Sequence, residues 1–317
     1  MITSSDITAV PAPRIAVIGP GALGTLFAAR LTQAGLPTLL LDYRRERAAA
    51  LSAHPLTVHD AHGVWQTAVP VSADPYMLQD MHVALVLVKA YQSEEVAATL
   101  ATYLPATAIA VSLQNGLGNV ESLMLHLGTE RAFGGTTAQG AFLRAPGVVE
   151  DTGHGPTVLG HLAGRQHPFL DALAQAMTQA RFSVTRTDDL PAALWMKTIL
   201  NAAINPVAAL TGLRNGQLSE HESSLTLMTA AAREAAHIAR KHGIHLGVMD
   251  WRARLQTICR ATATNINSML QDIRHTRRTE IDAINGAIVR IAESHKLPCT
   301  INRTLLLLLL TLQTRAE

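Results

Sequence analysis

Three polar side chains at helical spacing stand out in an otherwise apolar segment. Lys197, Asn201 and Asn205 occupy positions i, i+4 and i+8 of a stretch rich in alanine and leucine. At 3.6 residues per turn they lie along one face of a helix, where one cation and two amides would line a cleft. The structural alternative is that the amides satisfy local backbone carbonyls and the lysine is a solvated tip.

A second polar group falls in the stretch NINSMLQDIRHTRRTE, from Asn265 to Glu280. We select Asn265, Ser268 and Glu280 as candidates there, because an amide, a hydroxyl and a carboxylate can hold a polar substrate by hydrogen bonds. The remaining sequence predicts the helices and strands that would position these two groups of residues.

The N-terminal part contains a strand, a glycine turn, a helix and a second strand. The run RIAVIGPGALG (14–24) is β-branched and apolar before its glycines, Thr25 to Ala34 has a helical pattern, and Leu36 to Leu41 reads as a strand that closes at Asp42. This is the context in which a G-x-G-x-x-G spacing indicates dinucleotide binding, with the pyrophosphate at the helix N-terminus. The cofactor-binding positions predicted in this turn are Gly19, Pro20, Gly21, Ala22, Leu23 and Gly24.

Composition excludes several classes of protein. The 317 residues are 48% hydrophobic and 16% charged, with a net charge of +2 and no basic stripe, which argues against nucleic-acid binding. The two cysteines are too few for a disulfide framework, and neither they nor the dispersed histidines have metal-site spacing, so we predict a cytoplasmic protein without a metal. Residues 1–13 are predicted to be a disordered tail. The apolar run Leu305 to Leu310 is too short to span a membrane and predicts a buried terminal helix.

Two further apolar runs predict buried strands of a parallel sheet. They are Val83 to Val88 and Ala108 to Leu113, and they stop at Lys89 and just before Asn115. Ligands of open α/β sheets bind beyond the carboxyl ends of the strands, so both side chains are candidates for cofactor or substrate contact. The alternatives are a solvated strand-end lysine and an ordinary Asn-Gly turn.

The pattern changes from alternating strands and helices to long helices near 185–189. We therefore predict an α/β fold, with a Rossmann-type NADP-binding domain over 14–187 and an all-helical substrate and dimerisation domain over 188–317. The Gly- and Thr-rich stretch 134–157 is expected to form the closing edge of the first domain. The helices predicted in the second are 190–210, 223–242, 250–261, 268–274, 279–295 and 302–312.

Together, these motifs resemble those of the ketopantoate reductase (2-dehydropantoate 2-reductase) family. The segments that carry the resemblance run in the family's order from Arg14 to about Leu312. They are GPGALG (19–24), VKAYQ (88–92), QNGLGNVE (114–121), LWMKTILNAAINP (194–206) and SMLQDIRHTRRTEIDAINGAIV (268–289).

The resemblance implies that NADPH reduces 2-dehydropantoate to (R)-pantoate on the way to pantothenate and coenzyme A. By motif position it implies that Lys197 is the general acid and that Glu280 closes the site and also reaches the cofactor. The substrate-binding positions implied are Asn115, Lys197, Asn201, Asn205, Asn265 and Ser268, and further cofactor-side positions are Lys89, Gln92, Asn115 and Ala141.

The residue types suit this chemistry in themselves. Hydride attack on a keto carbon leaves an alkoxide, which the Lys197 ammonium can stabilise and protonate. Neutral donors such as Asn115 and Ser268 can hold the substrate carboxylate without cancelling that role. Glu280 can accept a hydrogen bond from the ketopantoate hydroxyl, or it can pair with Lys197 before substrate binds.

The choice between NADPH and NADH rests on conflicting signals at the end of the second strand. Asp42 suits the ribose 2′-hydroxyl of NADH and would repel a 2′-phosphate, whereas Arg44 or Arg45 can clamp that phosphate. The resemblance favours NADPH, with NADH as the alternative.

Two other functions stay open. One is an NAD-linked 2-hydroxy-acid dehydrogenase of the same fold that acts on another branched 2-keto acid. The other is a nucleotide-sensing protein without catalysis, against which the joint presence of Lys197 and Glu280 argues. The partner predicted in either enzyme is a small 2-keto acid, and the apolar helices of the second domain are compatible with a homodimer.

Overall fold

The computed structural model describes residues 12 to 314, which form two compact units. Unit 1 runs up to Val88 and includes Gln92–Gln114 and Val120–Leu190; unit 2 comprises Lys89–Tyr91, Asn115–Asn119 and the chain from Pro191 onward. Two short segments that follow strands of unit 1 in the chain therefore belong to unit 2. Of the predicted tail, residues 1–11 lie outside the described part, and Pro13 is buried.

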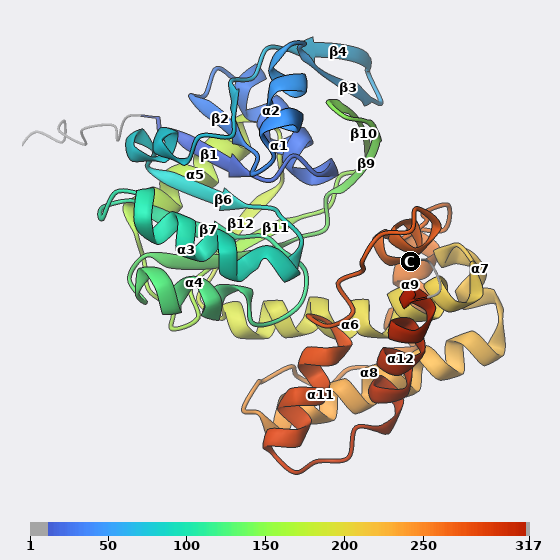
Figure 1. Ribbon diagram of the computed structural model, residues 1–317. Helices are drawn as coiled ribbons and strands as arrows, with labels where there is room; N and C mark the ends of the chain where they lie inside the picture. Colours follow the sequence, from blue (N-terminus) through green and yellow to red (C-terminus); the bar gives the residue numbers. More distant parts are fainter. Residues whose placement is uncertain (1–11, 315–317) are drawn as a thin grey trace, which may run out of the picture. The chain divides into compact units, whose positions relative to one another are not determined.

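Unit 1 is built on an eight-stranded sheet (Figure 1). Its strand order is β12-β11-β8-β7-β6-β1-β2-β5, and all neighbours are parallel except β8 and β11. The stretch from β5 to β8 has the 3-2-1-4-5-6 order of a dinucleotide-binding sheet. The strands are β1 (Ile15–Ile18), β2 (Thr38–Leu41), β5 (Val71–Ser72), β6 (Val83–Val86), β7 (Ile109–Ser112), β8 (Ala132–Thr137), β11 (Thr157–Gly160) and β12 (Val184–Thr187).

The central strands are apolar because both of their faces are covered. Every residue of β1, β2, β6 and β7 is buried, as expected for the middle of a parallel sheet. The helical elements of this unit are α1 (Ala22–Gln33), α2 (Arg45–Ser52), α3 (Ser93–Tyr103), α4 (Asn119–Leu127), α5 (Pro168–Gln179) and the short 3-10 turn Pro75–Asp80. A second 3-10 turn, Ala90–Gln92, starts in the segment Lys89–Tyr91 that belongs to unit 2.

A second, four-stranded sheet packs against α1. Its order is β4-β3-β10-β9, made from β3 (Leu56–Asp60), β4 (Gly63–Thr67), β9 (Gly140–Ala145) and β10 (Val148–Gly153). Because α1 contacts this sheet as well as β1 and β2, the whole run from Gly24 to Leu31 is buried. A helix enclosed in this way is apolar around most of its circumference.

Unit 2 is helical. Its helices are α6 (Leu190–Thr211), α7 (Asn215–Glu220), α8 (Glu222–Lys241), α9 (Trp251–Ala261), α10 (Ser268–Arg274), α11 (Asn285–Ser294) and α12 (Thr300–Thr314). One apolar core joins them, with buried residues on α6 and α8 such as Ile199, Ala203, Met228 and Ala235. The predicted fold class, a Rossmann-type domain plus a helical domain, is confirmed. Among residues 12 to 314, no helix is long and apolar enough to cross a membrane.

Three details differ from the sequence-based expectations. Helix α7 was not predicted, and the predicted helix over 279–295 begins only at Asn285, so Glu280 lies in the turns before α11. The expected buried helix around Leu305–Leu310 is buried on one side only, since Leu305 and Leu309 are enclosed while Leu307 is 57% exposed. Because every position in the run is leucine, the sequence has no polar residues there that would indicate which face of the helix is exposed.

Candidate functional site

The glycine turn between β1 and α1 has the geometry of a dinucleotide cradle. Gly19 has a φ of +102°, and a Cβ there would lie 2.6 Å from Cγ1 of Val88. A Cβ at Gly24 would overlap the carbonyl oxygen of Gly19, so the helix and the turn approach each other only because both residues are glycine. At Gly21, by contrast, a Cβ would have no atom within 4 Å, which leaves the space that a pyrophosphate requires.

The N-terminus of α1 is open toward a ligand in this turn. Its N-cap is Gly21, which has no side chain to accept hydrogen bonds from the first amides, so Ala22 and Leu23 begin the helix without a side-chain cap. Uncapped N–H groups at the positive end of a twelve-residue helix bind anions. Together with the open space at Gly21, this fits the phosphates of a nicotinamide dinucleotide.

A cavity of about 210 Å³ lies beside the turn within unit 1. Gly19, Asp42 and Gln92 line it together with apolar side chains that include Leu78 and Leu100. A slot with apolar walls and few polar groups suits a nucleoside. The predicted positions Gly19, Asp42 and Gln92 are therefore brought together here.

The carboxylate of Asp42 already accepts hydrogen bonds from protein groups. Its Oδ1 accepts hydrogen bonds from Nη2 of Arg47 at 2.6 Å and from the backbone N–H of Arg44 at 3.1 Å, and its Oδ2 accepts from Nε of Arg47. The hydrogen bond to Asp42 is the main cause that raises the pKa of the Arg47 guanidinium. Arg44 itself is exposed and its Nε donates to the Tyr43 hydroxyl at 3.1 Å.

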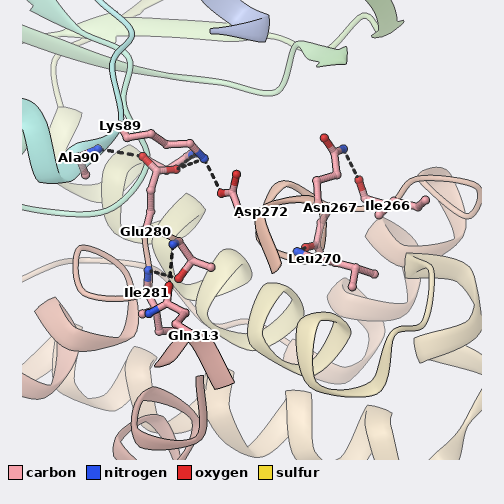
Figure 2. A network of polar contacts seen from close by, with 12 residues as sticks. Lys89, Ala90, Ile266, Asn267, Leu270, Asp272, Glu280, Ile281 and Gln313 are labelled. Atoms are coloured by element: carbon pink, nitrogen blue, oxygen red, sulfur yellow. Dashed lines mark hydrogen bonds and ion pairs between the residues drawn. The ribbon is translucent and has the colours of Figure 1, made fainter. Parts of the chain in front are cut away.

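Glu280 is the centre of a polar cluster in unit 2 (Figure 2). Its Oε1 accepts a hydrogen bond from the backbone N–H of Ala90 at 3.0 Å, and its Oε2 accepts one from Nδ2 of Asn115 at 3.1 Å. The Nζ atom of Lys89 lies 3.7 Å from Oε2 of Glu280 and 2.6 Å from Oδ2 of Asp272. Three of the predicted residues, Lys89, Asn115 and Glu280, thus meet in one cluster.

Burial and charge oppose each other in this cluster. Burial tends to lower the pKa of Lys89, but the charges of Glu280 and Asp272 outweigh it and the pKa is raised. Burial raises the pKa of Asp272, partly offset by Lys89. The Lys89 ammonium is therefore held firmly in its charged form between two acids.

Backbone contacts explain why Glu280 lies in a turn rather than a helix. The carbonyl of Ala283 accepts a hydrogen bond from the backbone N–H of Leu117 at 2.9 Å, and Gly116 packs so closely on Ala283 that a side chain would not fit. The N–H of Thr279 donates to Oε1 of Gln313 at 2.6 Å. These contacts hold the turns over 281–284 that precede the helix, and Glu280 is placed beside Asn115.

Lys197 is partly buried on α6, in the predicted row with Asn201 and Asn205. Burial lowers its pKa from the usual 10.5 to about 8, against an opposing effect of the Glu280 charge. A lysine in this range is still mostly protonated near neutral pH and releases its proton readily, which is what a general acid requires. Asn201 is partly buried and Asn205 is 6% exposed.

The helix around Asn205 has a specific support. Pro206 lies inside α6 and has no N–H to donate to the carbonyl of Ala202, which Nδ2 of Asn285 satisfies instead at 3.1 Å. Asn285 is fully buried and also donates to Oδ1 of Asn302 at 3.1 Å. This contact ties the start of α11 to the helix that carries Lys197.

The remaining predicted positions lie around α10 and on the smaller sheet. Ser268 is the exposed first residue of α10, one helical turn before Asp272, while Asn265 precedes the helix and its carbonyl accepts a hydrogen bond from the N–H of Asn215 at 3.1 Å. Ala141 lies on β9, opposite Asp151, and packs against the core of unit 1. The ligand contacts of all three stay predictions.

Two residues of these clusters were missed in the sequence. Asp272 lies in the stretch SMLQDIR at i+4 from Ser268, so helical spacing was a signal that could have identified it as a residue on the same face. Arg47 follows Asp42 by five residues, and only the start of α2 brings it back to the carboxylate. Among residues 12 to 314, no three His, Cys, Asp or Glu side chains are grouped to hold a metal ion.

Two family models of known proteins match most of this chain. The family model for ketopantoate reductase PanE/ApbA matches residues 15–164, and the model for its C-terminal part matches residues 189–313. A 2-dehydropantoate 2-reductase of Archaeoglobus fulgidus is 32% identical over 295 residues, covering 92% of this chain and 95% of the relative.

Solved structures share the fold. The crystal structure of a PanE/ApbA family ketopantoate reductase from Ralstonia eutropha JMP134 has a TM-score of 0.87 at 28% identity and covers 95% of this chain and 99% of its own. A D-mandelate dehydrogenase with NADH and anilino(oxo)acetate has a TM-score of 0.89, covering 95% of this chain and 99% of its own. At 23% identity the second likeness concerns the fold alone.

Proposed function

This chain belongs to the ketopantoate reductase family, and from that premise we propose that it reduces 2-dehydropantoate to (R)-pantoate with NADPH. Family membership makes it an oxidoreductase that uses a nicotinamide dinucleotide. The observation that carries the reductase part of this proposal is Lys197, which is partly buried on α6 in one row with Asn201 and Asn205, and whose pKa burial lowers to about 8 against the charge of Glu280. A proton donor of this kind is needed for reduction of a ketone and has no purpose in a nucleotide sensor.

The reaction divides the tasks between coenzyme and protein. The reduced nicotinamide, when bound, supplies a hydride to the keto carbon of the substrate. Lys197 stabilises the negative charge that develops on the keto oxygen and then transfers a proton from its Nζ to that oxygen. The opposing influences of burial and Glu280 keep the lysine protonated near neutral pH without making it too weak an acid.

The polar groups of unit 2 match the other functional groups of 2-dehydropantoate. Its carboxylate can be held by neutral donors, for which Asn115, Asn201, Asn205, Asn265 and Ser268 are the candidates. Its hydroxyl needs an acceptor. Glu280 accepts one protein hydrogen bond on each carboxylate oxygen, and each oxygen has a second lone pair for a substrate hydroxyl.

Lys89 and Asp272 have a supporting role in this proposal. The 2.6 Å ion pair with Asp272 offsets part of the charge of Lys89, which also lies 3.7 Å from Oε2 of Glu280, so that Lys89 competes less with Lys197 for the charge of Glu280. The hydrogen bonds that position Glu280 come from Ala90 and Asn115. The predicted cofactor contact of Lys89 would require part of this pairing to open.

A panel of 2-keto acids, each assayed with NADPH and with NADH, tests the proposed function. We expect the highest kcat/KM for 2-dehydropantoate with NADPH, and a much lower value for 2-ketoisovalerate, which has no hydroxymethyl group. A preference for 2-ketoisovalerate or an aromatic 2-keto acid with NADH would instead identify a 2-hydroxy-acid dehydrogenase. If the protein bound NADPH or NADH but oxidised neither with any keto acid of the panel, it would be a nucleotide sensor.

A further inference from the structure

The carboxylate of Asp42 is at the position where a Rossmann-type site ordinarily recognises the adenosine ribose of NADH. Here the Asp42 side chain has 0% of its surface exposed, and Arg47 hydrogen-bonds to both of its oxygens. The backbone N–H of Arg44 takes a third acceptor position at 3.1 Å. Because three of the roughly four acceptor positions of Asp42 are used and its side chain has no exposed surface, a ribose hydroxyl does not reach this carboxylate while Arg47 stays bound to it.

The ion pair also changes the charge that a coenzyme would meet. An unpaired Asp42 would repel the 2′-phosphate of NADPH, but the Arg47 guanidinium cancels that charge at hydrogen-bond distance. The Arg47 side chain remains 36% exposed, and a guanidinium that uses Nε and one Nη2 hydrogen has three N–H groups left. Arg47 is therefore bound to Asp42 and still able to donate outward.

A second arginine lies on the same exposed tyrosine. The guanidinium carbons of Arg44 and Arg47 lie 5.4 Å and 5.6 Å from the centre of the Tyr43 ring, which is 50% exposed. Tyr43 and Asp42 also line the cavity beside Gly19. Two guanidinium groups beside a tyrosine that lines the cavity can form a site for a phosphate monoester, which arginine binds in bidentate fashion.

We propose that Arg47 determines the coenzyme specificity of this chain by covering Asp42 and presenting, with Arg44, a binding site for the 2′-phosphate of NADPH. The inference rests on the proposed use of a nicotinamide dinucleotide. It gives Asp42 a role different from ribose recognition: the acid anchors the arginine. It also resolves the conflict between Asp42 and the arginines, because the acid and Arg47 act as one unit.

Direct binding tests the proposal without turnover. The dissociation constants of NADPH and NADH are measured from nicotinamide fluorescence on the full chain, in the absence of keto acid, for wild type and Arg47→Gln. We expect Arg47→Gln to bind NADPH more weakly, and to bind NADH more tightly because Asp42 becomes available to the ribose. The ratio of the two dissociation constants should shift at least ten-fold in favour of NADH. The matched control is Arg165→Gln, another arginine of unit 1 that pairs with an acid, Glu130, but does not line the cavity, and it should change the ratio less than three-fold.

A double variant separates the two tasks proposed for Arg47, which are to cover Asp42 and to bind the 2′-phosphate. In Asp42→Asn/Arg47→Gln no buried charge is left unpaired, so folding is protected, and neither the acid nor the arginine acts on the ribose. We expect it to lose NADPH affinity without the gain for NADH. An unchanged affinity ratio in both Arg47 variants, with thermal unfolding as in wild type, would overturn the proposal. Wild type that binds neither dinucleotide would instead refute the proposed function.

Discussion

The two units build their candidate sites from different parts of the polypeptide. In unit 1 the turn at Gly19–Gly24 is made of backbone, and its chemistry depends on side chains that are absent. In unit 2 the cluster around Glu280 is made of side chains from segments nearly 200 residues apart, such as Lys89 and Asp272. A backbone site requires the right conformation, whereas a side-chain site requires several segments to meet, so substitutions in the two should fail in different ways.

The largest effect is expected from loss of the proton donor in unit 2. Lys197→Ala removes the group that protonates the keto oxygen, so kcat for 2-dehydropantoate should fall by roughly 100-fold or more. NADPH affinity, measured by fluorescence, should stay near the wild-type value, because the turn that we propose to hold the phosphates belongs to unit 1. A variant with more than half of the wild-type activity would remove Lys197 from the mechanism.

A pair of glycine variants tests the backbone site in unit 1. Gly24→Ala places a methyl group against the carbonyl oxygen of Gly19 and should lower the free energy of unfolding by about 1–3 kcal/mol, the usual cost of overpacking. Gly21→Ala meets no atom within 4 Å, so it should unfold like wild type and yet bind NADPH more weakly. Thermal unfolding and fluorescence titration measure the two effects.

The opposite pattern would contradict the description of the turn. If Gly21→Ala lowered stability while leaving NADPH binding unchanged, the space beside Gly21 would serve folding rather than the pyrophosphate.

The smallest effect concerns substrate recognition by Glu280. Glu280→Ala should reduce kcat/KM for 2-dehydropantoate more than for 2-ketoisovalerate, narrowing the ratio of the two values by about ten-fold for a contact of about 1.4 kcal/mol. Steady-state kinetics on both keto acids give this ratio. Equal losses for the two would mean that Glu280 acts by positioning Lys197 or the cofactor, and not by accepting the substrate hydroxyl.

The sequence predicted the fold class and the glycine turn because both have local signatures. Continuous apolar runs indicate strands covered on two faces, and the spacing of Gly19, Gly21 and Gly24 is itself the steric requirement of the turn. The row of Lys197, Asn201 and Asn205 was equally local, since one helix contains all three.

What the sequence could not predict depends on contacts between distant segments. Arg47 looks like an ordinary surface charge until the start of α2 is seen, and the helical spacing that places Asp272 near Ser268 gives no sign of its ion pair with Lys89. The late start of α11 has the same origin, because Ala283 gives its carbonyl to Leu117 instead of to a helix. The roles of Glu280 and Asn115 came from resemblance, and the hydrogen bond between them has no local signal.

The central claim is that Lys197 acts as the acid, and the pH dependence of kcat/KM tests it most directly. Reduction requires protonated Lys197, and burial lowers its pKa to about 8. With NADPH saturating, kcat/KM for 2-dehydropantoate should therefore be constant on the acid side of pH 8 and fall about ten-fold per pH unit above it. This break should be absent from the residual activity of Lys197→Ala. A wild-type profile that stays flat through this range, or the same break in Lys197→Ala, would contradict the account.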